Sequence, residues 1–169
     1  VISTDSTKYQ SDLKVCYRDD ITVVPRSAEA ASDHATSEEA ILDCLERIEY
    51  HEYICFIQCT SPLTEPKDLI RLIRAVKDGG YDSETFYTED YGYYAELHDF
   101  KKMVTWLPRQ ERTPLSRIAG NAWCFKTSGF LKYRRRLFGN IGYIEIDKHK
   151  ILEIDDYTDV KVASVLLEG

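Results

Sequence analysis

The sequence predicts an α/β fold with a mainly parallel sheet, and two patterns along the chain support this class. Short segments rich in apolar and β-branched residues alternate with longer segments whose apolar residues recur every three or four positions. This alternation is typical of parallel strands joined by helices that cross over the sheet. The chain has 169 residues and contains no internal repeat or linker, so we expect residues 1–169 to form a single domain.

The expected strands are short and bounded by turn residues. Residues 53–57 are apolar throughout, as is typical of a strand covered on both faces, and residues 21–25 are β-branched and end at a proline. The six expected strands cover residues 1–4, 21–25, 53–57, 83–88, 121–125 and 141–146.

Four helices are expected between or after these strands. Residues 37–48 carry one apolar face, with Ser37 as the candidate N-cap, and residues 66–78 begin at Pro66 and stop before two glycines. Two further helices are expected over residues 127–137 and 159–167. The tyrosine-rich stretch 91–106 alternates, which indicates a hairpin or a small antiparallel excursion.

Composition and charge exclude several classes of protein. The chain has 22 Lys and Arg against 29 Asp and Glu, and an acidic protein lacks the field that drives non-specific nucleic-acid binding. No apolar run approaches the roughly 20 residues of a membrane span. The five cysteines are scattered and odd in number, which favours reduced thiols over a disulfide framework. We therefore expect a cytoplasmic protein without nucleic-acid or membrane partners.

Three loops that follow expected strands carry more polar residues than a turn requires. They cover residues 26–37, 58–63 and 153–159. Ligands of such sheets bind at the carboxyl ends of the strands, so these loops are the first place to look for chemistry. The first loop ends at a helix N-terminus, whose free N–H groups can hold a phosphate or a base edge.

The acidic loop has two interpretations. Glu153 and Asp155 alternate around Ile154, so in an extended segment both carboxylates point the same way and suit Mg²⁺. Alternatively, the loop is an acidic turn that caps the final helix through Asp156 or Asp159.

An arginine-rich segment is the remaining candidate. Arg109, Arg112 and Arg117 lie within nine residues of a proline-containing loop and can bind a carboxylate or phosphate with two donors each. They could equally pair with acids across a dimer or a hairpin. The sequence contains no G-x-G-x-x-G, P-loop or G-x-S-x-G motif.

Taken in order, these segments resemble the acylneuraminate cytidylyltransferase family, also called CMP-sialic acid synthetases. Residues 26–33 are similar to its R-P-x-x-[LA]-A-x-D loop, and residues 58–63 to its L-Q-P-T-S-P-L-R signature. Residues 108–120 resemble its R-Q-x-x-P…R-x-N-G segment, and residues 153–155 the start of its closing D-I-D-T-x-x-D. Agreement in order and spacing over nearly the whole chain is more specific than any one motif.

The resemblance implies a three-layer, Rossmann-like fold of the nucleotide-diphospho-sugar-transferase type. It implies an enzyme that transfers CMP from CTP to the anomeric hydroxyl of a sialic-acid-like nonulosonic acid, with Mg²⁺ as cofactor and pyrophosphate as leaving group. It also implies a homodimer, in which residues 91–108 form a dimerisation excursion.

The resemblance also implies roles for individual residues. Glu153 and Asp155 are expected to hold the metal and to be catalytic. Arg26, Ala35 and Ser37 are expected to bind the nucleotide, and Gln58, Arg109 and Arg117 the sugar acid.

The sequence departs from the family pattern at several places. The family's N-terminal strand and its A-R-x-G-S-K-G loop are absent, which is roughly 30 to 40 residues on the size of such βα units. Cys59, Thr64 and Ala119 stand where proline, arginine and asparagine are usual. Two alternatives therefore remain: a catalytically inactive homologue that binds nucleotide or sugar acid, and a 3-deoxy-manno-octulosonate cytidylyltransferase.

Overall fold

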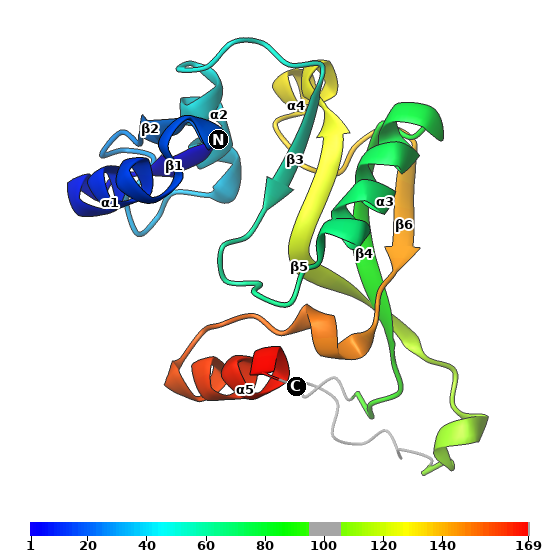
Figure 1. Ribbon diagram of the computed structural model, residues 1–169. Coiled ribbons are helices and arrows are strands. Elements are labelled where there is room, and N and C mark those ends of the chain that lie inside the picture. Colours follow the sequence, from blue (N-terminus) through cyan, green and yellow to red (C-terminus); the bar gives the residue numbers. More distant parts are fainter. Residues whose placement is uncertain (95–105, 169) are drawn as a thin grey trace. The chain divides into compact units, whose positions relative to one another are not determined.

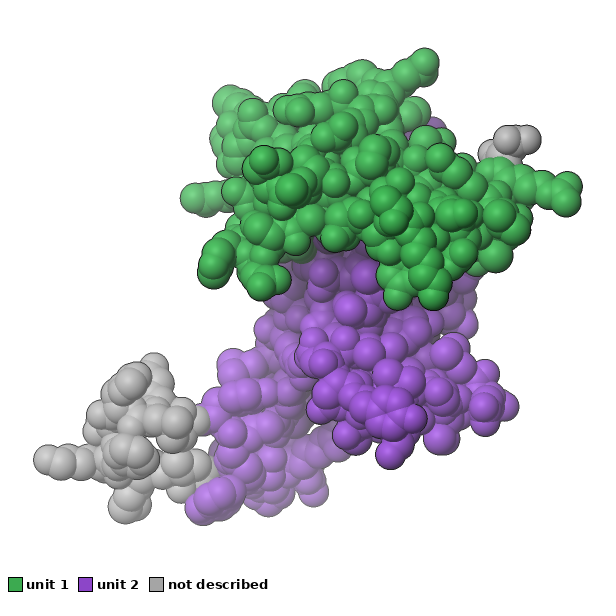
Figure 2. All heavy atoms as spheres, turned by 90° about the vertical axis from the view of Figure 1, so that its left-hand side faces the viewer, with its two compact units in different colours: residues 1–52, 127–136 green, residues 53–126, 137–169 purple. Residues whose placement is uncertain are grey.

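The structure is a computed structural model that describes residues 1–94 and 106–168 (Figure 1). The chain forms two compact units. Unit 1 comprises Val1–Glu52 with Thr127–Arg136, and unit 2 comprises Tyr53–Lys126 with Leu137–Gly169 (Figure 2). The single domain expected over residues 1–169 stays a prediction.

Unit 1 contains a parallel pair of short strands. β1 (Ile2–Thr4) pairs with β2 (Val23–Pro25), with Ile2 opposite Val23. They are joined by α1 (Thr7–Tyr17) and the short 3₁₀ helix η1 (Arg18–Asp20). Sequence reasoning missed α1 because the helix buries no residue and so has no apolar stripe to detect. Its signal is the N-cap Ser6, whose hydroxyl accepts a hydrogen bond from the Tyr9 backbone N–H.

The second helix of unit 1 starts from a capping box. α2 (Ser37–Leu45) has Thr36 as its N-cap, so the prediction of Ser37 as the cap was wrong by one residue. The Thr36 hydroxyl accepts from the Glu39 backbone N–H at 3.2 Å, and the Glu39 carboxylate accepts from the Thr36 N–H at 2.6 Å. Of Thr36 and Ser37, only Thr36 has a glutamate three positions later, and this reciprocal pair decides the cap. α4 (Thr127–Tyr133) is shorter than predicted.

Unit 2 contains a four-stranded sheet in the order β3-β5-β4-β6. The strands are β3 (Tyr53–Ile57), β4 (Ser83–Asp90), β5 (Leu115–Lys126) and β6 (Ile141–Glu145). β4 is parallel to β6, and β5 is antiparallel to both β3 and β4, so three of the strands run in one direction. The mainly parallel α/β class is confirmed, while the reversed direction of β5 was not predicted.

One helix covers a face of this sheet. α3 (Pro66–Asp78) has the predicted bounds, and it lies along the sheet in Figure 1. Its buried Leu72 and Val76 join a core cluster with Phe86 of β4 and Ala122 of β5. Burial of each such large apolar side chain stabilises the fold by about 1.5–3 kcal/mol. The unit also contains η2 (Arg109–Glu111), η3 (Lys148–Ile151) and α5 (Tyr157–Glu168).

A large irregularity interrupts the pairing of β4 and β5. Thr85 lies opposite Trp123 and Tyr87 opposite Ile118, so Phe86 of β4 alone spans the stretch of β5 from Ala119 to Ala122. Bulges of this kind bend a strand and re-aim its residues, and they are common beside active sites. Here the bulge contains Gly120 and Asn121, which lie next to the end of β3 because the Gln58 N–H donates to the Asn121 carbonyl at 2.9 Å.

Several expectations about the whole chain have different outcomes. All five cysteines are free. Among the described residues, no helix is both long and apolar enough to cross a membrane. The predicted excursion over residues 91–108 falls largely on residues 95–105, which lie outside the described part of the chain, so this excursion and the homodimer stay predictions.

Candidate functional site

Two of the loops singled out in the sequence meet in unit 2. The Gln58 side-chain amide donates to Glu153 Oε1 at 3.2 Å, and the Ile154 N–H donates to the Thr60 carbonyl at 2.8 Å. Gln58 directly follows β3, and Glu153 follows η3. The structure therefore brings together one expected acceptor-binding residue and one expected metal ligand, which are 95 positions apart in sequence.

Gly120 leaves the space that Glu153 occupies. A Cβ atom added at Gly120 would lie 1.9 Å from Glu153 Oε1 and 2.8 Å from its Cδ, far inside normal contact. The half-buried carboxylate thus packs directly on the β5 backbone. Glycine is required here by close approach rather than by its backbone angles.

Asn121 is a residue of this site that sequence reasoning missed. It is fully buried, its Nδ2 donates to Thr64 Oγ1 at 3.1 Å, and its carbonyl accepts from the Gln58 N–H. Asn121 therefore holds both ends of the segment 58–64. An isolated asparagine in an apolar strand gives no signal in sequence, because its partner Thr64 is far away in the chain.

Two buried polar atoms lie on the same elements without a partner among the described residues. They are the Ser61 hydroxyl and the Asn121 Oδ1 atom. An unsatisfied buried polar group costs roughly 1–3 kcal/mol, so each of these two atoms is placed to form a hydrogen bond with a water molecule or a ligand.

The two interpretations of the acidic loop apply to different residues. Asp156 Oδ1 accepts from the Thr158 N–H at 2.6 Å, and Asp159 Oδ2 accepts from the N–H groups of Asp155 and Asp156 at 3.0 Å. The backbone N–H groups of Asp159 and Thr158 hold the pKa of Asp156 below its usual range. Asp156 and Asp159 therefore cap α5, and the side chains of Glu153 and Asp155 take no part in that cap.

The carboxylates of this loop fit a hard cation whose remaining coordination positions are filled by a ligand and water. Asp155 is exposed, and among the described residues Glu153 is hydrogen-bonded through a single oxygen, to Gln58. Within the ranges 1–94 and 106–168, no three His, Cys, Asp or Glu side chains gather closely enough to enclose a metal. Mg²⁺ usually takes one or two protein carboxylates together with water and phosphate oxygens, which is the arrangement these residues can offer.

The three expected nucleotide-binding residues all lie in unit 1. The Arg26 guanidinium donates to the Ser3 carbonyl at 2.8 Å and to the Ser3 hydroxyl at 3.2 Å, so it is tied to the end of β1. The Ala35 N–H closes a turn onto the Ser32 carbonyl at 2.9 Å, and Ser37 is the first residue of α2. Their nucleotide-binding roles stay predictions.

The arginine-rich segment separates into three different environments. Arg112 donates to the carbonyls of Leu107 and Tyr91 at 2.8 Å and stacks on a tyrosine ring, so its role here is structural, with backbone carbonyls as partners in place of the expected acids. Arg117 is exposed on β5 opposite Thr88, which corrects the expectation of a loop at this position. The first part of β5, before residue 121, was not predicted as a strand, because its exposed polar residues obscure the strand pattern. Arg109 is exposed in η2, with its guanidinium 5.2 Å from the centre of the Tyr91 ring.

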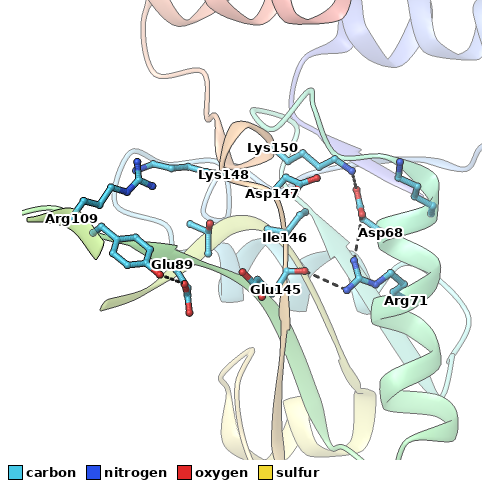
Figure 3. A pocket seen from close by; sticks show the side chains of 12 residues that line it. Asp68, Arg71, Glu89, Arg109, Glu145, Ile146, Asp147, Lys148 and Lys150 are labelled. Atoms are coloured by element: carbon cyan, nitrogen blue, oxygen red, sulfur yellow. Dashed lines mark hydrogen bonds and ion pairs between the residues drawn. The ribbon is translucent and has the colours of Figure 1, made fainter. Parts of the chain in front are cut away.

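Arg109 also lines a pocket of about 600 Å³ (Figure 3). The start of α3, the carboxyl ends of β4 and β6, and the two 3₁₀ helices η2 and η3 form its walls. Gln58, Glu153, Asp155 and Arg117 are not among its lining residues. Sequence reasoning missed the other cations of the pocket, Lys67, Arg71, Lys148 and Lys150, because residues so far apart in the chain form no local motif.

A buried ion-pair network forms one wall of the pocket. Lys150 Nζ donates to Asp68 Oδ2 at 2.6 Å and to the carboxylate of Glu65, and both Lys150 and Asp68 are buried. The ammonium groups of Lys150 and Lys67 lower the pKa of Glu65 to about 2. The network fastens η3, which leads to Glu153, onto the start of α3.

The α/β fold is similar to that of two solved structures with low sequence identity. The chain is similar to a solved 4-diphosphocytidyl-2C-methyl-D-erythritol synthase from Anaerococcus prevotii, with a TM-score of 0.67, 12% identity, and coverage of 96% of this chain and 77% of that one. It is also similar to a CMP:2-keto-3-deoxy-manno-octonic acid synthetase solved with CTP, with a TM-score of 0.68, 10% identity, and coverage of 98% and 79%.

Sequence comparison identifies the family. The Cytidylyltransferase family matches residues 1–154, and the chain belongs to this family. Cytidylyl transfer from CTP is thus the class of chemistry that the comparisons support, whereas the acceptor is a matter for proposal.

Proposed function

We propose that the protein transfers the cytidylyl group of CTP to the anomeric hydroxyl of a sialic-acid-like nonulosonic acid and releases pyrophosphate. The family match supports the transfer from CTP. The observation that carries the proposal within the structure is the contact between Gln58 and Glu153, since it joins the segment expected to bind the acceptor to the segment expected to hold the metal.

In this reaction the anomeric oxygen attacks the α-phosphorus, and the bond from that phosphorus to the bridging oxygen of pyrophosphate breaks. Negative charge grows on the phosphates, so catalysis depends on alignment and charge neutralisation. Mg²⁺, when bound, supplies positive charge at the phosphate oxygens. Glu153 and Asp155 would hold this ion, and the Glu153 carboxylate would at the same time orient the amide of Gln58 toward the acceptor.

The remaining roles follow the family resemblance. Arg26, Ala35 and Ser37 would bind the nucleotide, and Arg109 and Arg117 the carboxylate of the acceptor. A homodimer built through residues 91–108 belongs to the same proposal. A 3-deoxy-manno-octulosonate cytidylyltransferase is the second candidate, because guanidinium groups bind the carboxylate of any 2-keto sugar acid equally well.

Release of pyrophosphate by the full-length protein tests the proposal. We expect release that requires CTP, Mg²⁺ and one of N-acetylneuraminate, legionaminate, pseudaminate or 3-deoxy-manno-octulosonate, and the most efficient acid identifies the acceptor. Glu153→Gln should lower kcat by at least 100-fold, whereas Glu168→Gln, at the far end of α5, should not. Release no faster than background with all four acids would refute cytidylyl transfer. Calorimetric binding of CTP without release would then indicate a binding homologue.

A further inference from the structure

We propose that the pocket between α3, β4, β6 and η3 binds a polyhydroxylated carboxylic acid, with Lys148 and Arg109 on its carboxylate and Arg71, Glu145 and Asp147 on its hydroxyls. This inference rests on the proposed function, because the ligand of this chemical class is the sugar-acid acceptor. In the pocket it adds Lys148, Arg71, Glu145 and Asp147 to Arg109, whereas Gln58 and Arg117, the other residues proposed to bind the acceptor, do not line this pocket.

The first observation is the placement of cations around the pocket. Figure 3 shows Arg109 and Lys148 on one side of the end of β6 and Arg71 on the other. Lys148 is exposed, and its ion pair with Asp90 is long, at 3.7 Å. Arg109 lies over a tyrosine ring, a contact that leaves the N–H groups at the rim of its guanidinium available. These two cations can therefore reach a ligand without breaking a close ion pair.

Arg71 and Lys67 add two further cations at the start of α3. Lys67 forms an ion pair with Glu65 at 2.8 Å, whereas the pair between Arg71 and Asp68 is long, at 3.9 Å. Arg71 is held toward the pocket by a hydrogen bond of 3.3 Å to the Glu145 carbonyl. A guanidinium has five N–H donors, so Arg71 keeps donors available for a ligand.

The carboxylates of the pocket decide between ligand classes. Glu145 and Asp147 are exposed beside the cations, and among the described residues neither side chain accepts a hydrogen bond. A site for a simple anion such as phosphate would not place such acids at its wall, because like charges repel. Carboxylates accept hydrogen bonds from hydroxyl groups, so this mixed lining fits a ligand that carries one negative charge and several hydroxyls.

Size and polarity agree with this class. About 600 Å³ lies within the range of pockets that hold small molecules. Ile146 is the one aliphatic side chain among its lining residues, all of which are described, so a ligand with a large apolar face gains little here. The buried pair of Lys150 and Asp68 cancels its own charge and braces the wall. The charges that remain for the ligand are the exposed ones.

Calorimetry with defined probes tests the pocket in the full-length protein. The probes are N-acetylneuraminate, 3-deoxy-manno-octulosonate, the neutral methyl ester of N-acetylneuraminate, and inorganic phosphate. We expect at least one acid to bind at least ten times more tightly than the methyl ester, and phosphate at equal concentration not to displace it. Lys148→Ala should reduce the preference for the acid over the ester by at least threefold, because it removes one of the two cations on the carboxylate and leaves Arg109.

Two matched pairs separate the pocket from general surface charge. Arg71→Ala should weaken the acid and the ester alike by about tenfold, whereas Arg74→Ala, exposed on the same helix outside the pocket, should change neither. Lys77→Ala is the corresponding control for Lys148→Ala. In kinetic assays the two pocket variants should raise KM for the acid and leave KM for CTP unchanged.

The outcomes distinguish this inference from the proposed function. Turnover with unchanged KM for the acid in both pocket variants overturns the inference and leaves cytidylyl transfer intact. Binding of the acids that depends on Lys148 and Arg71, without any CTP-dependent turnover, supports the pocket and refutes the proposed reaction. Equal affinity for phosphate and the sugar acids, or no binding of either acid, overturns the pocket assignment.

Discussion

Replacing Gly120 with alanine should displace Glu153 without unfolding the protein. The added Cβ would lie 1.9 Å from Glu153 Oε1, whereas real Cβ contacts under 3.0 Å essentially never occur. The carboxylate must therefore retreat by more than about 1 Å. The Glu153 side chain is half-buried and can adopt another rotamer. We therefore expect the substitution to change the position of the carboxylate more than the free energy of unfolding.

The functional cost follows from the contact that is lost. A shift of this size breaks the 3.2 Å hydrogen bond between Gln58 and Glu153 and moves a proposed metal ligand. Misplacement of a catalytic group by about 1 Å can cost on the order of 100-fold in rate. Gly120→Ala should accordingly lower kcat for pyrophosphate release by roughly 100-fold, raise the Mg²⁺ concentration needed for half-maximal rate, and change Tm by no more than a few degrees.

A second substitution makes this reasoning falsifiable. Gly120→Ala combined with Glu153→Asp shortens the carboxylate side chain by one methylene and removes the overlap with the new methyl group. The double variant should be more active than Gly120→Ala alone, although Glu153→Asp by itself is expected to lower the rate. A Gly120→Ala enzyme with kcat within threefold of the wild type would refute the placement of Glu153, and so would a double variant less active than both single ones.

Three further predictions concern stability. Burial raises the pKa of Glu84 to about 7 from the usual 4.5, so its carboxyl stays protonated in the fold and stabilisation falls as pH rises between these values. Between pH 4.5 and 8, the free energy of unfolding of the wild type should fall by roughly 3 kcal/mol relative to that of Glu84→Gln. If urea denaturation gives the same difference between the two proteins at both pH values, the prediction is wrong. Thr36→Ala should cost about 1 kcal/mol of unfolding free energy through loss of the α2 cap, and no change in the urea midpoint would dismiss the capping box. Lys150→Met should cost about 3–5 kcal/mol, because it leaves the buried Asp68 with only the long 3.9 Å ion pair to Arg71, and adding Asp68→Leu should recover part of that loss in the same denaturation assay.

Sequence reasoning predicted well those elements whose packing follows from a local pattern of apolar residues. β3 and α3 have the predicted bounds, because a fully apolar strand and an amphipathic helix between proline and glycine need no distant partner to be recognised. α1 and the first half of β5 were missed because their residues are mostly exposed. The direction of β5 could not be read from its residues, since a strand covered on both faces has the same composition whether it runs parallel or antiparallel.

The candidate site divides in the same way. Gln58 and Glu153 were singled out by their positions after strands, and the structure joins them. Asn121 and Lys148 were not singled out, because each acts through partners that only the folded chain brings near. Arg112 was grouped with Arg109 and Arg117 by sequence spacing, and it is the one of the three whose guanidinium is occupied by backbone carbonyls.

The segment from Glu145 to Asp155 connects the pocket to the acidic loop. Its first half lines the pocket and is fastened to α3 by Lys150, and its second half is fastened to the loop after β3 by the hydrogen bond from Ile154 to Thr60. Only Ile151 to Glu153 separate these two points of attachment, so a shift of the backbone at Lys148 or Asp147 has few residues over which to relax before it reaches Glu153. We therefore expect an acceptor bound in the pocket to be aligned, through this short segment, with a nucleotide held through the acidic loop.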